Sequence, residues 1–128
     1  MTKKPFLIKD RLKSFSYAFQ GFKVLIGNEH NARIHIFAAI IAIIAGIALK
    51  ISSLEWIIVI VSIFLVLAAE AFNSALEYLC NFVSPQYHEL IKKIKDLSAL
   101  AVLFIAIAAF VSGLIIFLPK IINICVNY

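Results

Sequence analysis

Residues 56–77 of the chain read WIIVIVSIFLVLAAEAFNSALE. The stretch is apolar through Ala69 apart from Ser62, and polar side chains then recur at the spacing i, i+3, i+4 and i+7: Glu70, Asn73, Ser74 and Glu77. In a helix this spacing places all of them on one face, which we call the polar stripe. Inserting a carboxylate at membrane depth costs about 2.5–3.5 kcal/mol on insertion scales. Two carboxylates on one helix face therefore indicate a functional site.

The composition around the polar stripe is that of an integral membrane protein. Of the 128 residues 63% are hydrophobic and the mean hydropathy is +1.02, whereas soluble domains contain about 45–50% apolar residues. A soluble domain of this length could not bury so much apolar surface, and the chain is too short for a soluble kinase fold. We therefore expect a single all-α membrane domain over residues 1–128, with apolar stretches at 34–49, 54–82 and 97–118.

Local signals divide the chain into an interfacial helix and three membrane spans, over residues 5–26, 30–50, 53–82 and 85–119. Large apolar side chains recur along one face of the first helix, at Leu12, Phe15, Phe19 and Phe22. This pattern is typical of a helix in the membrane interface, although packing on the bundle would give the same pattern. Ser52 and Glu55 form a capping-box pattern before the second span, and Ser84-Pro85 predicts the start of the third.

Lysine and arginine residues are spread unevenly between the connections. Most precede the first span or lie between the second and third spans, at Lys92, Lys93 and Lys95, whereas the other connections hold only Lys50 and Lys120. By the positive-inside rule the N-terminus and the connection after the second span face the cytoplasm. The net charge of +5 thus indicates topology and attraction to anionic lipid, and we expect no nucleic-acid partner.

This topology brings polar groups of all three spans to the cytoplasmic membrane face. They are Glu29, Glu70, Asn73, Glu77, Lys95 and Asp96. Three carboxylates repel one another at low dielectric, and a bound divalent cation is the simplest way to neutralise this repulsion. Oxygen ligands suit Mg²⁺, which usually binds one or two carboxylates together with substrate phosphates. A neighbouring lysine would be placed to hold phosphate.

Two other interpretations stay open when only residue types and spacing are considered. Glu70 and Glu77 could pair with Lys95 or Arg33 and merely fix the helix packing. Intramembrane carboxylates also suit a small proton- or cation-coupled transporter, although no inverted repeat or broken helix is visible. His35, which interrupts the first span, fits an interfacial or packing position better than a ligand position.

Several motifs resemble the prokaryotic diacylglycerol kinase and undecaprenol kinase family. They are EAFNSALE at 70–77, YHEL at 87–90, KDLSALAVL at 95–103, and Asn28-Glu29 followed by N-x-R-I-H at 31–35. The resemblance implies a small membrane lipid kinase with three transmembrane helices and an N-terminal surface helix, assembled as a homotrimer. It also implies the use of Mg²⁺ and ATP without a P-loop, and the chain contains no G-x-x-x-x-G-K-[ST] motif.

The resemblance further implies roles for single residues. Glu70 matches the proposed catalytic base, and Glu29 and Glu77 match ligands of the metal that accompanies ATP. Other positions match active-site or nucleotide-contacting residues of the family: Asn73, Lys95, Asp96, Arg11, Lys13 and Tyr17. The implied substrate is a lipid alcohol of the bacterial plasma membrane, either diacylglycerol, giving phosphatidic acid, or undecaprenol, giving undecaprenyl phosphate. The chain departs from the family at Asn81, where the family commonly has Asp.

Overall fold

The computed structural model describes the backbone of residues 8–126 and the side chains of residues 12–126. This part of the chain consists of helices and short connections, without a β-strand. The helices are α1 (Ile8–Asn28), α2 (His30–Ala48), α3 (Ser53–Val83) and α4 (Glu89–Val126). The predicted all-α class, with one surface helix and three helices long enough to span a membrane, is confirmed.

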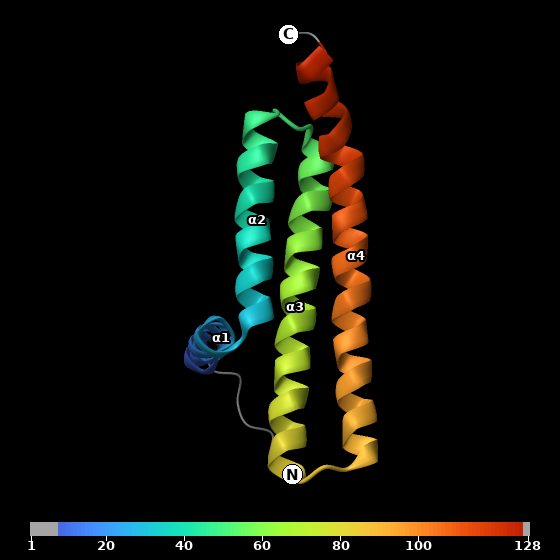
Figure 1. Ribbon diagram of the computed structural model, residues 1–128. Coiled ribbons are helices and arrows are strands. Elements are labelled where there is room, and N and C mark those ends of the chain that lie inside the picture. The colour runs from blue at the N-terminus through green and yellow to red at the C-terminus, as the bar shows by residue number, and fades with distance from the viewer. Residues whose placement is uncertain (1–7, 127–128) are drawn as a thin grey trace.

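Helices α2, α3 and α4 lie side by side, and α1 crosses the bundle at the start of α2 (Figure 1). Helix α3 packs extensively on α4 and less on α2, whereas α2 and α4 hardly touch. The apolar face of α1 points away from the bundle, because Leu12, Phe15 and Phe19 are 65–69% exposed. Among the α1 side chains that the structure describes, from residue 12 on, Leu25 near the end of the helix is the buried one. An outward apolar face on a helix that crosses the bundle is typical of a helix in the membrane interface.

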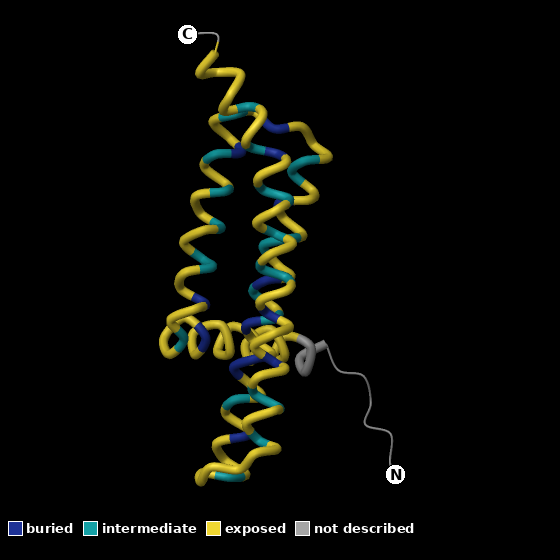
Figure 2. The backbone as a smooth tube through the Cα atoms, turned by 45° about the vertical axis from the view of Figure 1, so that its right-hand side comes forward, coloured by how far each residue is buried: buried dark blue, intermediate teal, exposed yellow. Residues whose placement is uncertain are grey.

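The outer surface of the bundle is apolar. In the most hydrophobic windows of α2, α3 and α4 only 11%, 17% and 6% of the residues are buried, and residues coloured as exposed dominate Figure 2. The mean hydropathies of these windows are 1.9 in α2, 2.3 in α3 and 2.9 in α4. An apolar surface of this extent requires an apolar surrounding, so the chain is a membrane protein.

The three membrane helices differ in length. At 1.5 Å per residue, the 19 residues of α2 span about 28 Å, close to the roughly 30 Å of a bilayer core. The 31 residues of α3 and 38 residues of α4 reach about 46 and 57 Å. Figure 1 shows α3 and α4 continuing past α1 to their connecting loop. This end of the bundle therefore extends beyond the interface marked by α1.

The third membrane helix was predicted over 85–119 but runs from Glu89 to Val126. Ser84 does not cap it, because its hydroxyl donates to the Gln86 carbonyl at 3.1 Å and forms a turn. His88 is the cap instead: its carbonyl accepts from the Lys92 N–H at 3.0 Å and its Nδ1 accepts from the Leu90 N–H at 3.2 Å.

Pro119 does not end α4 either. A proline inside a helix removes one backbone donor, and membrane helices tolerate this where the freed carbonyl finds other partners. The residues that follow, Ile121, Ile122 and Ile124, are apolar and continue the helix.

The turn between α2 and α3 lies at the end of the bundle away from α1 (Figure 1). The Ile51 N–H donates to the Gly46 carbonyl at 3.1 Å and the Lys50 N–H to the Ile47 carbonyl at 3.2 Å. These bonds form a Schellman motif, with Lys50 left-handed at φ 49°. The predicted capping box is confirmed: Ser52 Oγ accepts from the Glu55 N–H at 3.3 Å, and the Glu55 carboxylate accepts from the Ser52 N–H at 2.6 Å.

Gly46 is the point at which this turn has no room for a side chain. A Cβ there would lie 2.8 Å from Cη2 of Trp56 and 3.1 Å from Cδ1 of Ile51. We predict that Gly46→Ala destabilises the protein by about 1–3 kcal/mol, because the indole ring must move. Thermal unfolding in detergent tests this, with Gly113→Ala as the control, since a Cβ at Gly113 meets nothing closer than 3.9 Å. Equal stability of the two variants would contradict the prediction.

Candidate active site

The polar stripe is the most buried part of α3. Glu70, Asn73 and Ser74 are 2%, 9% and 5% exposed, and Glu70 is the largest fully buried side chain in the described part of the chain. Most large apolar side chains of the bundle are exposed by contrast. The inverted distribution follows from the apolar surrounding, which favours polar groups in the protein interior.

Glu70 meets a histidine of α2. Its Oε1 lies 3.1 Å from Nε2 of His35, which is 24% exposed. The ring N–H is not aligned with this oxygen, so the two groups are in close polar contact without a directional hydrogen bond. The sequence suggested a packing or interfacial position for His35, and the structure places it on the expected catalytic base.

The cations that could have paired with the polar stripe contact other groups. Arg33 donates from Nε to the Ile26 carbonyl at 2.7 Å and from its terminal nitrogen to the Gly27 carbonyl, so it caps the end of α1. Lys95 donates to Oδ1 of Asn81 at 2.8 Å. Within the described residues, the interpretation of the polar stripe as a packing device paired with Arg33 or Lys95 is therefore not supported.

Asn73 is held from α4. The hydroxyl of the buried Ser98 donates to Oδ1 of Asn73 at 2.7 Å, and it also lies 2.9 Å from the Lys95 carbonyl. With its oxygen occupied, the Asn73 amide keeps its N–H groups available for other partners. Ser98 thus fixes the middle of the polar stripe against the helix that carries Lys95.

Glu29 is turned toward the lower half of α3. It is the N-cap residue of α2, but its side chain makes no capping bond. Its Oε1 instead accepts from the Tyr78 hydroxyl at 3.0 Å, and the Tyr78 oxygen accepts from Nδ2 of Asn28 at 3.3 Å. Because Tyr78 follows Glu77 in α3, this contact brings Glu29 to the level of the second stripe carboxylate.

Glu77 is half-buried, and its carboxylate has no hydrogen bond or ion pair with the described residues. The negative charges of Glu29 and Glu77 both act on Glu70. The described residues include no group of three or more His, Cys, Asp or Glu side chains that could hold a metal by themselves. A cation at Glu29 and Glu77 would therefore need further oxygen ligands, such as phosphate.

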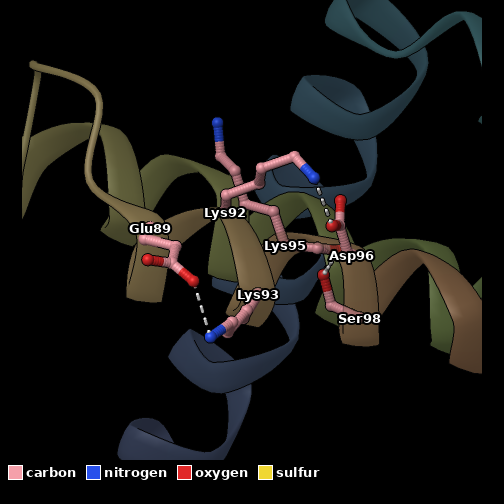
Figure 3. A network of polar contacts seen from close by, with 6 residues as sticks. All are labelled: Glu89, Lys92, Lys93, Lys95, Asp96 and Ser98. Carbon is pink, nitrogen blue, oxygen red and sulfur yellow. Dashed lines mark hydrogen bonds and ion pairs between the residues drawn. The ribbon is translucent and has the colours of Figure 1, made fainter.

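Charged side chains gather on the first turns of α4, as Figure 3 shows. Lys92 pairs with Asp96 at 3.2 Å and Lys93 with Glu89 at 2.9 Å, and all four side chains are more than 60% exposed. Such exposed i, i+4 pairs are weak and can exchange partners. Asp96 therefore lies at the exposed edge of the site, outside the buried stripe.

Two of the expected nucleotide-contacting residues of α1 have described side chains. Lys13 and Tyr17 are exposed, Tyr17 by 66%. The Arg11 side chain lies outside the described side chains, although its backbone belongs to α1.

The family model of prokaryotic diacylglycerol kinase matches residues 16–117. The chain belongs to this family. The undecaprenol kinase of Bacillus subtilis strain 168 is 34% identical over 108 residues, covering 84% of this chain and 88% of that protein. The diacylglycerol kinase of Synechocystis is 35% identical over 116 residues, covering 90% and 66%. That of Escherichia coli K12 is 29% identical over 105 residues, covering 82% and 86%.

Membership in the family makes the chain a phosphotransferase, with ATP as the co-substrate that a kinase implies. The transporter interpretation is therefore set aside. The named relatives carry two different lipid names, undecaprenol and diacylglycerol.

The polar contacts of His35, Ser98 and Tyr78 in the site were not predicted from the sequence. A signal was present for Ser98, a small polar residue three positions after Lys95 and therefore on the same helix face. Nothing in the spacing of Tyr78 pairs it with Glu29, because their contact joins two helices.

Proposed function

We propose that the chain is an ATP- and Mg²⁺-dependent lipid kinase. It transfers the γ-phosphoryl group to the hydroxyl of diacylglycerol or undecaprenol, giving phosphatidic acid or undecaprenyl phosphate. The observation that carries this proposal is the burial of Glu70 against His35, which lines one end of an apolar groove. A buried carboxylate beside a lipid-sized groove suits a general base for a hydroxyl that arrives from the membrane.

The groove runs between α2, α3 and α4 and has a volume of about 600 Å³. Its walls are almost entirely apolar, with small side chains such as Ala38, Ala42, Ala109 and Gly113. One end is lined by His35, the residue that contacts Glu70. A lipid chain lying in this groove would have its hydroxyl beside Glu70.

ATP binds from the cytoplasmic side in this proposal. Lys95 and Asp96 lie on the turns of α4 nearest the connecting loop, and Asn73 joins them through Ser98. Lysine suits phosphate as a compact positive charge. We assign the remaining nucleotide contacts to α1, through Arg11, Lys13 and Tyr17.

Glu29 and Glu77 fit a Mg²⁺ site. Glu77 lacks a partner in the described chain, and Glu29 uses only Oε1 for Tyr78, so both offer carboxylate oxygen to a hard cation. When bound, Mg²⁺ neutralises phosphate charge. The protein groups then have separate tasks, since Glu29 and Glu77 hold the cation whereas Glu70 handles the proton.

The reaction requires one proton transfer by the protein. Glu70 accepts the proton of the lipid hydroxyl, the hydroxyl oxygen forms a bond to the γ-phosphorus, and the bond from that phosphorus to the bridging oxygen breaks to release ADP. Glu70 afterwards returns the proton to water. Its burial excludes water during transfer, which disfavours hydrolysis of ATP.

We further propose that the chain forms a single domain over residues 1–128 and works as a homotrimer in the bacterial plasma membrane, with its N-terminus in the cytoplasm. Support for the orientation comes from the concentration of lysine and arginine before α2 and at the start of α4. Support for assembly comes from the low burial of α2, α3 and α4 within one chain.

The proposed base is tested by Glu70→Gln. We expect the wild-type protein to transfer labelled phosphate from ATP to diacylglycerol or undecaprenol, with the product resolved by thin-layer chromatography. Glu70→Gln should lower kcat by at least about 100-fold, as expected for loss of a general base. Glu55→Gln, a carboxylate at the outer end of the same helix, is the control and should stay near wild type. Wild-type turnover by Glu70→Gln would contradict the assignment, and an unlabelled lipid fraction in the wild type would contradict the function.

The metal assignment is tested separately by Glu77→Gln. Removal of one carboxylate ligand should raise the Mg²⁺ concentration for half-maximal activity by about tenfold. The measurement is a Mg²⁺ titration of lipid phosphorylation at saturating ATP, again with Glu55→Gln as the control. A Mg²⁺ curve unchanged from wild type would remove Glu77 from the metal site.

A further inference from the structure

We propose that His35 is a positioning residue for the phosphoryl transfer. It holds Oε1 of Glu70 and thereby turns Oε2 toward the hydroxyl of a lipid lying in the apolar groove. This inference rests on the proposed function, in which Glu70 is the base. It assigns a specific task to a residue that the sequence suggested to be a packing or interfacial histidine.

The first support is the isolation of Glu70. The carboxylate is 2% exposed, and His35 is the one side chain among residues 12–126 found at ion-pair distance from it. The other nearby acidic groups, Glu29 and Glu77, are carboxylates that repel Glu70 when ionised. A buried carboxylate without a donor is strongly unfavourable, and His35 is the group placed to supply one.

The second support is the place of His35 in the groove. It lines the same cavity as Ala38 and Ala42, one and two turns further along α2. His35 lies six residues after Glu29, which places it about 9 Å deeper along the helix axis. The imidazole is thus in contact with the base on one side and borders the proposed lipid site on the other.

The geometry leaves the two carboxylate oxygens in different settings. Oε1 faces His35 at 3.1 Å without an aligned N–H. A small rotation of the ring converts this contact into a directional hydrogen bond, which would fix the carboxylate plane. Orientation of a reacting group within a fraction of an ångström has a large effect on rate, so loss of the imidazole should act on kcat.

The test compares two substitutions of similar size. His35→Leu removes every polar atom, whereas His35→Gln keeps an N–H donor at the same number of bonds from the backbone as Nε2. We expect His35→Leu to lower kcat about tenfold, with less than twofold change in KM for ATP and for the lipid. His35→Gln should recover most of the lost kcat. If His35→Leu does not assemble, His35→Asn, whose amide is one carbon shorter, takes its place with the same expected loss.

Three results would overturn the proposal. One is wild-type kcat in His35→Leu, and another is equal loss in the Leu and Gln variants. The third is a raised KM for the lipid at unchanged kcat, which would make His35 a groove residue only. The wild-type protein in the same assay separates these results from failure of the proposed function, because that failure would leave the lipid unlabelled in every sample.

Discussion

The burial of the Glu70 carboxylate beneath α2 is the constraint around which the bundle is organised. The outer surface is apolar, so the polar face of α3 must turn inward and meet α2 and α4. His35 and Ser98 are the residues that receive it, one from each neighbouring helix. The burial that keeps this polar face away from lipid also excludes water from the surroundings of Glu70, where the proposed proton transfer takes place.

Because the helices differ in length, the polar groups of the site lie at different levels along the bundle. Helix α2 begins at the interface where α1 crosses, whereas α3 and α4 continue past it (Figure 1). Glu70 therefore lies inside the bundle, Glu29 and Tyr78 lie at the interface, and the charged first turns of α4 extend beyond it. With this arrangement a lipid hydroxyl can reach Glu70 from one side while a nucleotide phosphate approaches from the other. Bringing these two reactants together is the central requirement of a lipid kinase.

Residue spacing was sufficient to predict the four helices, apart from the two ends of α4, and the polar stripe and the capping box at Ser52. Each of these depends on local periodicity or on neighbours three to four residues away. Contacts between helices were not predictable in this way. Arg33 and Lys95 were candidate partners of the stripe, yet they bind backbone carbonyls and Asn81. The partner of Glu70 depends on the rotation of α2 against α3, which one sequence does not specify.

The most direct test of this organisation is a double-mutant cycle between Glu70→Gln and His35→Leu, with kcat for lipid phosphorylation measured in all four proteins. If the imidazole acts through the carboxylate, removing the imidazole should not lower kcat further once Glu70 is a glutamine. The double variant is then expected to be as slow as Glu70→Gln alone. A double variant slowed by the product of the two single effects would contradict a shared role.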